Sequence, residues 1–359
     1  MVTSFRPLIP VLLFSLVALT GCASGGDGTT PSSAPSGASS PTSTTAPAAE
    51  EPSAGEQVFG GACDAVLSDD DAGAVLGVPA RAQSGPEALL PFTQSARAIG
   101  GLNCGWDAAD ESELAALRLT VLPINALTEQ PTTEDNYCDV LPGEGECLFS
   151  IVEQGLSFSG TMGPSADATS EEINAQISSL TSLITSAASE AGTENVPSPP
   201  ALDGEWPFEV DCTALAQRVD AAALLAVPGL VLAADAPNGP MEAPPGYFAA
   251  ASAAGSTSCT WFGSAGDGGG ETESIFADFL PGGSWIADEV AALPGAQELT
   301  GGGVERAILV TDPALSADRA QVLHVFDGAN WLAITAGQMT VDESFLPFAA
   351  AVVAERNAE

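Results

Sequence analysis

Seven cysteines and a single histidine are the residues of this chain with the widest choice of chemistry. Cysteine forms disulfides, binds metals or acts as a nucleophile, and histidine moves protons near neutral pH. A structural zinc site needs four Cys or His ligands held close together. The sequence contains no Cys-x-x-Cys, and one histidine cannot complete a ligand set, so we predict no metal ion and no cofactor.

The histidine, His324, lies in an apolar run beside Val322 and Val325. A hydrolase with a Ser-His-Asp triad on a nucleophile elbow needs a Gly-x-Ser-x-Gly turn, and none occurs. We therefore interpret His324 as a structural or surface residue of a strand. A carboxylate pair for glycan hydrolysis stays open among the 47 acidic residues, but no pair stands in an apolar setting. We predict no catalytic residues.

Two polar runs have structural explanations. The run Ser68-Asp69-Asp70-Asp71 lacks the central Gly and the closing Glu of a calcium loop, and acids are favoured at a helix N-terminus. The run from Gly266 to Glu271 lacks the Lys-Ser/Thr that grips phosphate. We predict a helix start for the first run and a long hairpin connection for the second.

The aromatic residues divide into two groups. Trp106 and Trp261 each lie two residues after a cysteine, which favours packing in a core against a disulfide. Trp285, Trp331 and Tyr247 have no such neighbour and are candidates for an exposed binding surface.

The beginning of the chain has the pattern of a secretory signal. Arg6 precedes an apolar run from Leu8 to Leu19, and small residues follow. This run is shorter than the roughly 20 apolar residues that a membrane-spanning helix needs, and it contains Pro10. We therefore expect residues 1–21 to be a signal peptide.

Leu19, Thr20, Gly21 and Cys22 resemble the lipobox of bacterial lipoproteins. The resemblance implies that the chain is cut before Cys22 and that its thiol carries a diacylglycerol. Two or more acyl chains anchor a protein stably, whereas one alone is marginal. We expect a lipid anchor on the extracytoplasmic side of the cell membrane; the alternative is an ordinary secreted protein.

Residues 22–57 join this anchor to the rest of the chain. Beyond Cys22 they are nearly all Gly, Ser, Thr, Pro and Ala, which bury too little apolar surface to offset chain entropy. We predict a disordered tether.

The charge of the chain excludes some partners. It holds 47 acidic residues against 8 basic ones, all arginine, for a formal net charge of −39. Nucleic-acid binding depends on Lys and Arg neutralising phosphates, so we predict no nucleic-acid partner. Without lysine, Schiff-base chemistry and the P-loop lysine are also excluded.

An internal repeat organises the rest of the sequence. Cys63–Pro79 and Cys212–Pro228 align without a gap, and each half then carries a Cys-x-Trp, followed by a strand ending in Leu-Pro. We predict a first repeat domain at 58–192, a Pro-rich linker at 193–206 and a second repeat domain at 207–359.

The repeat narrows the disulfide pairing of the six cysteines after Cys22. The second half holds only Cys212 and Cys259, so these two must pair if that domain folds by itself. By analogy Cys63 pairs with Cys104, which leaves Cys138 with Cys147 across the turn-rich LPGEG segment. Disulfides are expected in an oxidising, exported setting.

Local patterns predict the same order of elements in both halves. A leading helix starts at Ser68 and stops at Gly77, and a trailing helix starts at the capping box of Thr169 and Glu172. A second trailing helix is expected near Phe345–Val353. Alternation at residues 117–121 and paired runs around Gln154-Gly155 and Asp327-Gly328 predict antiparallel strands. The fold class is therefore α+β, with two tandem related domains, each an antiparallel sheet with a leading and a trailing helix stapled by disulfides.

These landmarks resemble those of actinobacterial lipoproteins known mainly as a domain of unknown function. Cys63, Leu76, Gly77, Cys104 and Trp106 carry the resemblance, and the second half departs from it with Ala226 in place of the glycine. The chain is also similar to the extracytoplasmic sensor domains of mycobacterial receptor kinases. The resemblance implies a module that binds or senses a ligand in the envelope.

We expect a non-catalytic envelope lipoprotein that binds a ligand or a protein partner. The alternatives are a carboxylate-dependent hydrolase of cell-wall glycans and a purely structural envelope lipoprotein.

Overall fold

The structure is a computed structural model, and it describes residues 55–83, 89–110, 115–129, 137–139, 146–165, 168–192, 196, 206–207, 210–233, 245–263, 273–311 and 321–358. Residues 50–359 form one compact unit. The predicted signal peptide, the lipobox and nearly all of the tether lie outside the described residues, as do most of the predicted linker and the run from Gly266 to Glu271.

The first half contains six strands and three α-helices among its described residues. In chain order these are α1 (Asp69–Leu76), β1 (Ala80–Ala82), α2 (Pro91–Ala98), β2 (Leu102–Ala108), β3 (Ala116–Pro123), β4 (Tyr137–Asp139), β5 (Glu146–Glu153), β6 (Leu156–Gly163) and α3 (Ser170–Ala191). Short 3-10 turns lie at Val58–Gly61, Cys63–Ala65 and Ile124–Ala126.

The second half repeats this order with additions. It contains α4 (Cys212–Arg218), α5 (Ala221–Leu224), β7 (Val231–Leu232), α6 (Pro245–Ala254), β8 (Thr257–Phe262), β9 (Ser274–Leu280), α7 (Ala287–Ala291), β10 (Gln297–Leu299), β11 (Arg306–Thr311), β12 (Gln321–Asp327), β13 (Asn330–Gly337) and α8 (Leu346–Arg356). Its 3-10 turns lie at Gly283–Ile286 and Glu343–Phe345.

The two sheets share one topology, which agrees with the duplication. The first has the order β1-β2-β3-β6-β5-β4, and the second has β7-β8-β9-β13-β12-β11 with β10 added at its end. All neighbouring strands are antiparallel. The α+β class and the two related domains are confirmed.

The leading helix of the first half forms as its caps predict. The Ser68 hydroxyl accepts a hydrogen bond from the Asp71 backbone N–H, and Asp71 in turn accepts one from the Ser68 N–H. Gly77 ends the helix with a φ of +76°, a conformation that glycine adopts without steric cost.

The leading helix of the second half departs from the predicted single element. It is divided into α4, which starts at Cys212, and the one-turn α5, whose N-cap is Asp220. Asp220 has a non-helical ψ of 79° and interrupts the helical path, while its side chain caps Ala223. Ala226, in the place of Gly77, still adopts a positive φ of 55°.

The trailing helices and hairpins are confirmed. The capping box of Thr169 and Glu172 starts α3, and Pro347 lies in the first turn of α8. Strands β5 and β6 turn at Gln154-Gly155, both with positive φ, and β12 and β13 turn beside Asp327.

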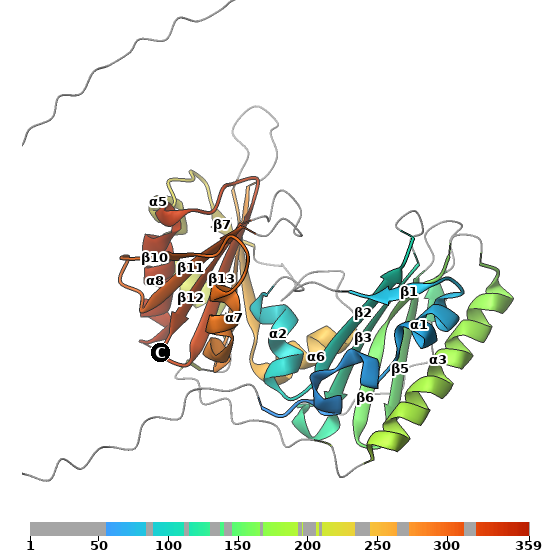
Figure 1. Cartoon of the computed structure of the whole chain (residues 1–359). Helices are drawn as coiled ribbons and strands as arrows, with labels where there is room; N and C mark the ends of the chain where they lie inside the picture. Colours follow the sequence, from blue (N-terminus) through green and yellow to red (C-terminus); the bar gives the residue numbers. More distant parts are fainter. Residues whose placement is uncertain are drawn as a thin grey trace, which may run out of the picture. The chain divides into compact units, whose positions relative to one another are not determined.

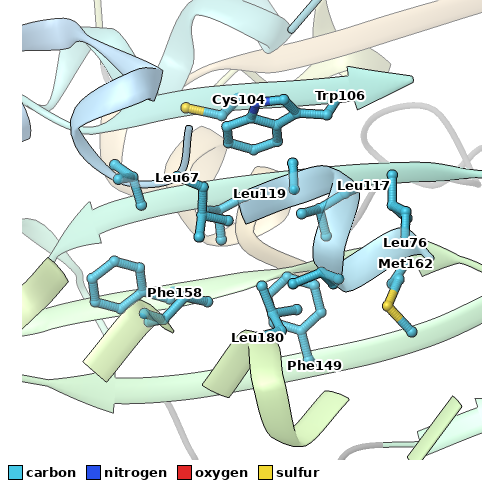
Figure 2. Close-up of a cluster of buried hydrophobic side chains, with 14 of the residues drawn as sticks. Leu67, Leu76, Cys104, Trp106, Leu117, Leu119, Phe149, Phe158, Met162 and Leu180 are labelled. Atoms are coloured by element: carbon cyan, nitrogen blue, oxygen red, sulfur yellow. The ribbon is translucent and has the colours of Figure 1, made fainter. Parts of the chain in front are cut away.

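Each sheet buries one face under its own helices. In the first half α1 and α3 lie on the same face of the sheet (Figure 1), and α3 contributes Ile173, Ile177, Leu180 and Ile184 to the core. Figure 2 shows the centre of this core, where Trp106 and Cys104 of β2 lie with Leu119 of β3 and Leu180 of α3. Phe348, Val352 and Val353 of α8 play the corresponding part in the second half.

Helices α2 and α6 were not predicted, and they connect the two halves. Helix α2 of the first half contacts β9 and β13 of the second sheet, whereas α6 of the second half contacts β3 and β6 of the first. The two helices also contact each other. Each sheet has a second face that its own trailing helix does not cover. These faces and the two helices form a third apolar cluster, which contains Ala96, Ile99, Ala250, Ala254 and Trp331. Each half thus completes the burial of the other.

Candidate functional site

The face of the first sheet opposite α1 and α3 carries a row of polar side chains. Four strands place them side by side in register: Asn103, Thr120, Ser159 and Ser150. Thr120 and Ser159 are buried, and Gly246 of α6 lies against both. The oxygens Asn103 Oδ1 and Thr120 Oγ1 have no hydrogen-bond partner among the described residues. The row is packed rather than open.

The second sheet places Ser258, Asp278, Ala333 and His324 at the corresponding positions. These residue types invite comparison with a catalytic triad, but their order does not match one. Asp278 lies directly opposite Ser258, and His324 is separated from Asp278 by the strand that carries Ala333. In a triad the histidine stands between the serine and the aspartate. The arrangement therefore lacks the geometry of a Ser-His-Asp relay.

His324 lies in the interior as a neutral imidazole. Its Nδ1 accepts a hydrogen bond from Trp331 Nε1 at 3.3 Å, and the two rings stack with 5.8 Å between centroids. Burial lowers the pKa of His324 to about 3, because a charged ring would lose its hydration there. The interpretation as a structural strand histidine agrees with this placement, although the residue is buried and not on the surface.

The tryptophans follow the prediction in part. Trp106 and Trp261 are buried in the two cores beside Cys104 and Cys259, as expected. The expectation of an exposed Trp331 is wrong: it is fully buried, because the other half covers the face of the sheet that carries it. Trp285 is half-buried beneath the Arg97 guanidinium, and Tyr247 stacks on Phe92.

The six cysteines form the three predicted disulfides. Cys63 is bonded to Cys104 and Cys212 to Cys259, at equivalent places in the two halves, and Cys138 is bonded to Cys147 across β4 and β5. Asp69 and Asp71 act at the start of α1, where the Asp69 carboxylate also accepts from the Ala82 N–H. No cluster of metal-binding side chains occurs among the described residues. None of the described helices combines the length and apolarity needed to cross a membrane.

An open groove of about 540 Å³ lies between α1 and α3 on the outer side of the first half. We name it the α1–α3 groove. It is lined by Ala74, Gly77, Ser165, Ala168, Glu172, Ala175, Gln176 and Ser179. Six of these eight side chains are Gly, Ala or Ser, so the groove exists because no large side chain fills the space between the two helices.

The polar side chains of the groove are Ser165, Glu172, Gln176 and Ser179, of which only Glu172 is a pure acceptor. The Glu172 carboxylate accepts from the backbone N–H and the hydroxyl of Thr169, and these bonds lower the pKa of Glu172. Gln176 Oε1 is buried and finds no partner within the described part of the chain. An unpaired buried acceptor is costly, but this oxygen lies beneath the surface of the groove rather than on it.

Sequence reasoning used Glu172 as a cap and did not identify Gln176 or the groove. A signal was nonetheless present. In a chain with 47 acidic residues, the stretch from Ile173 to Ser189 carries no charge, and small residues recur on its outer face. Whether such a face is open depends on the neighbouring helix, which only the fold shows.

No protein-family model and no curated protein matches the chain. Among solved structures the chain has a similarity to the di-domain ARO/CYC StfQ from the steffimycin biosynthetic pathway. The two are 10% identical, with a TM-score of 0.16, and the match covers 82% of this chain and 86% of that chain. A similarity at this TM-score carries no argument about fold or activity.

Proposed function

We propose that this protein is a lipid-anchored extracytoplasmic binding protein that takes up its ligand or partner, without catalysis, in the α1–α3 groove. The observation that carries the proposal is the groove itself, with its small lining residues and the Glu172 carboxylate that Thr169 holds at its edge. Concave sites with a few placed polar groups are the usual form of ligand sites.

The chain's beginning and its disulfides support the cellular setting. Cys22 ends a lipobox-like sequence behind a signal-like leader, and the three disulfides fit an oxidising compartment. A tether of residues 22–57 would hold the folded part away from the membrane surface.

To test the binding role, a larger apolar side chain is placed in the groove. Ala175→Leu adds bulk at a lining position on a well-formed helix, and Asn174→Leu adds the same bulk at an adjacent exposed position outside the groove. Because a ligand that binds the folded state raises its melting temperature, fractions of envelope extract are screened for a stabilising one. The rise in melting temperature that the ligand causes in the wild type should persist in Asn174→Leu and vanish in Ala175→Leu. An equal shift in all three proteins would overturn the groove as the binding site.

A further inference from the structure

We propose that strand β7 is a docking edge for a partner protein, which adds an extended apolar segment with basic flanks as a further strand of the second sheet. This surface is separate from the α1–α3 groove and goes beyond the proposed function. The inference comes from comparing β7 with β1, the strand in the same place in the first half.

Both strands lie at the end of a sheet, so each has one edge without a neighbouring strand. In β7 the Ala233 N–H donates to Thr260 O of β8. Because successive residues of an antiparallel strand direct their backbone groups to opposite sides, the N–H and C=O of Leu232 point away from the sheet. The same pattern places the Ala82 N–H at the outer edge of β1.

The first half closes this edge with a side chain, and the second half does not. The Asp69 carboxylate of α1 accepts a hydrogen bond from the Ala82 N–H at 2.8 Å. In the aligned repeats Arg218 stands in the place of Asp69, and it forms an ion pair with Glu355. No acceptor meets the Leu232 N–H within the described part of the chain. An open edge of this kind is a template for another strand.

The side chains beside the two edges differ in the same way. In the first half Arg81 lies opposite Asp107, and Asp107 pairs with Arg118 at 2.7 Å. The equivalent residues of the second half are Val231, Phe262 and Phe276, which lie on one face of the sheet. Val231 is 62% exposed and Phe262 is 39% exposed. Since the same corner of the fold carries charges in the first half, the fold does not require apolar residues there.

The edge and its side chains determine the kind of partner. An added strand would bond to the N–H and C=O of Leu232 and would place alternate side chains on the face of Val231 and Phe262. Apolar β-branched residues suit such positions. Glu273 pairs with Gly263, the residue after Phe262, and the chain has a formal net charge of −39. This charge favours Lys or Arg beside the docked segment and opposes a second copy of the chain.

The experiment mixes the purified full chain with the peptide acetyl-Lys-Val-Thr-Val-Thr-Val-Lys-amide at about 150 mM salt, where general attraction to the acidic surface is screened. The control peptide has the same sequence with its five central amides N-methylated, so it keeps the charge and side chains but loses these backbone donors.

Hydrogen exchange at the Leu232 N–H, followed by NMR, reports on the edge itself. Exchange should be fast in the free chain and should slow about tenfold with the first peptide at about ten times its dissociation constant. The methylated peptide should leave the exchange unchanged. The Ala82 N–H, which already donates to Asp69, should respond to neither peptide.

Three variants test the side chains and the edge. Val231→Arg combined with Phe262→Asp gives the second half the charged pair of the first. Leu148→Ser, which removes an exposed apolar side chain from the first sheet, is the matched control. We expect the double variant to weaken peptide binding at least about tenfold through lost apolar contact, and the control to leave it unchanged. Leu232→Pro should weaken it as well, since it removes the outward donor and leaves the bonds to β8 in place.

Equal binding of the methylated peptide, or undiminished binding by the double variant, would overturn the proposal. So would a Leu232 N–H that is protected in the free chain. Protection that falls on dilution would mean that a second copy occupies the edge, and protection at every concentration would mean that the chain covers the edge itself. The α1–α3 groove is tested separately by Ala175→Leu, so the proposed function can stand or fall without this result.

Discussion

Arg97 of α2 and Glu289 of α7 form a bidentate ion pair that joins the two halves of the protein. Arg97 Nη1 and Nη2 lie 2.8 and 2.6 Å from the two carboxylate oxygens, and the guanidinium stacks over Trp285 with 4.6 Å to the ring centroid. The pair holds α2 against the second half, on which the shared apolar cluster depends. The two domains therefore pack against each other and do not behave as independent units.

Replacing Arg97 with lysine tests this contact. Lysine keeps the charge but cannot make the planar two-bond contact or stack in the same way. Because both partners are partly exposed, we expect a loss of about 1 kcal/mol in the free energy of unfolding, measured by urea denaturation. No change in stability, or a biphasic transition already in the wild type, would contradict the account of one cooperative unit.

Gly246 tests how closely α6 packs on the sheet of the other half. A Cβ added there would overlap Ser159 Oγ and would lie 2.8 Å from the Cβ of Thr120. We expect Gly246→Ala to destabilise the protein by about 1–3 kcal/mol through overpacking, although alanine is the better helix former. Adding Ser159→Ala should recover part of the loss, and a stabilised single variant would show that α6 does not lie there.

Equivalent positions at the ends of the two leading helices should respond in opposite ways to exchange of alanine and glycine. Ala226 adopts a φ of 55° where Gly77 has 76°, and only glycine takes this conformation without steric cost. We expect Ala226→Gly to stabilise the protein by about 0.5–1 kcal/mol and Gly77→Ala to destabilise it by at least as much. Thermal denaturation of both variants checks the pair, and changes of the same sign would contradict it.

His324 predicts a dependence of stability on pH. Since its folded-state pKa is about 3, below the ordinary value of 6.5, the unfolded chain binds the proton first as the pH falls. Its contribution to stability is fully present above about pH 6.5 and is lost toward pH 3, by up to about 1.4 kcal/mol per pH unit.

The variant His324→Gln isolates this effect from that of the many carboxylates. Glutamine keeps an acceptor for Trp331 Nε1 but does not titrate. The difference in urea midpoint between wild type and variant should therefore shrink between about pH 6.5 and 4.5. A difference that stays constant over this range would mean that His324 is not buried as a neutral ring.

The parts of the fold that could be predicted from the sequence are those specified by neighbouring residues. Ser68 and Asp71 determine the start of α1, Thr169 and Glu172 that of α3, and the repeated cysteines determine their own pairing. Helices α2 and α6 were not predicted, because α2 has Leu90 at its N-cap instead of a capping side chain and α6 is nearly all small residues with no hydrophobic stripe. Their position depends on the other half.

The same physical cause explains the errors at candidate sites. Trp331 was a candidate for an exposed surface because no cysteine lies beside it in the sequence, whereas in the fold the first half of the chain covers the face of the sheet that carries it. The α1–α3 groove arises from the space that two particular helices leave between small side chains. The burial of Trp331 and the groove both depend on residues that are far apart in the sequence.

The proposed cellular role depends most on the lipid that we propose for Cys22. Mass spectrometry of the N-terminal peptide of the protein, purified from membranes of its native cells, measures it directly. The account predicts a peptide that begins at Cys22 and carries a thioether-linked diacylglycerol. A peptide that begins elsewhere, or one with an unmodified Cys22, would contradict the anchor.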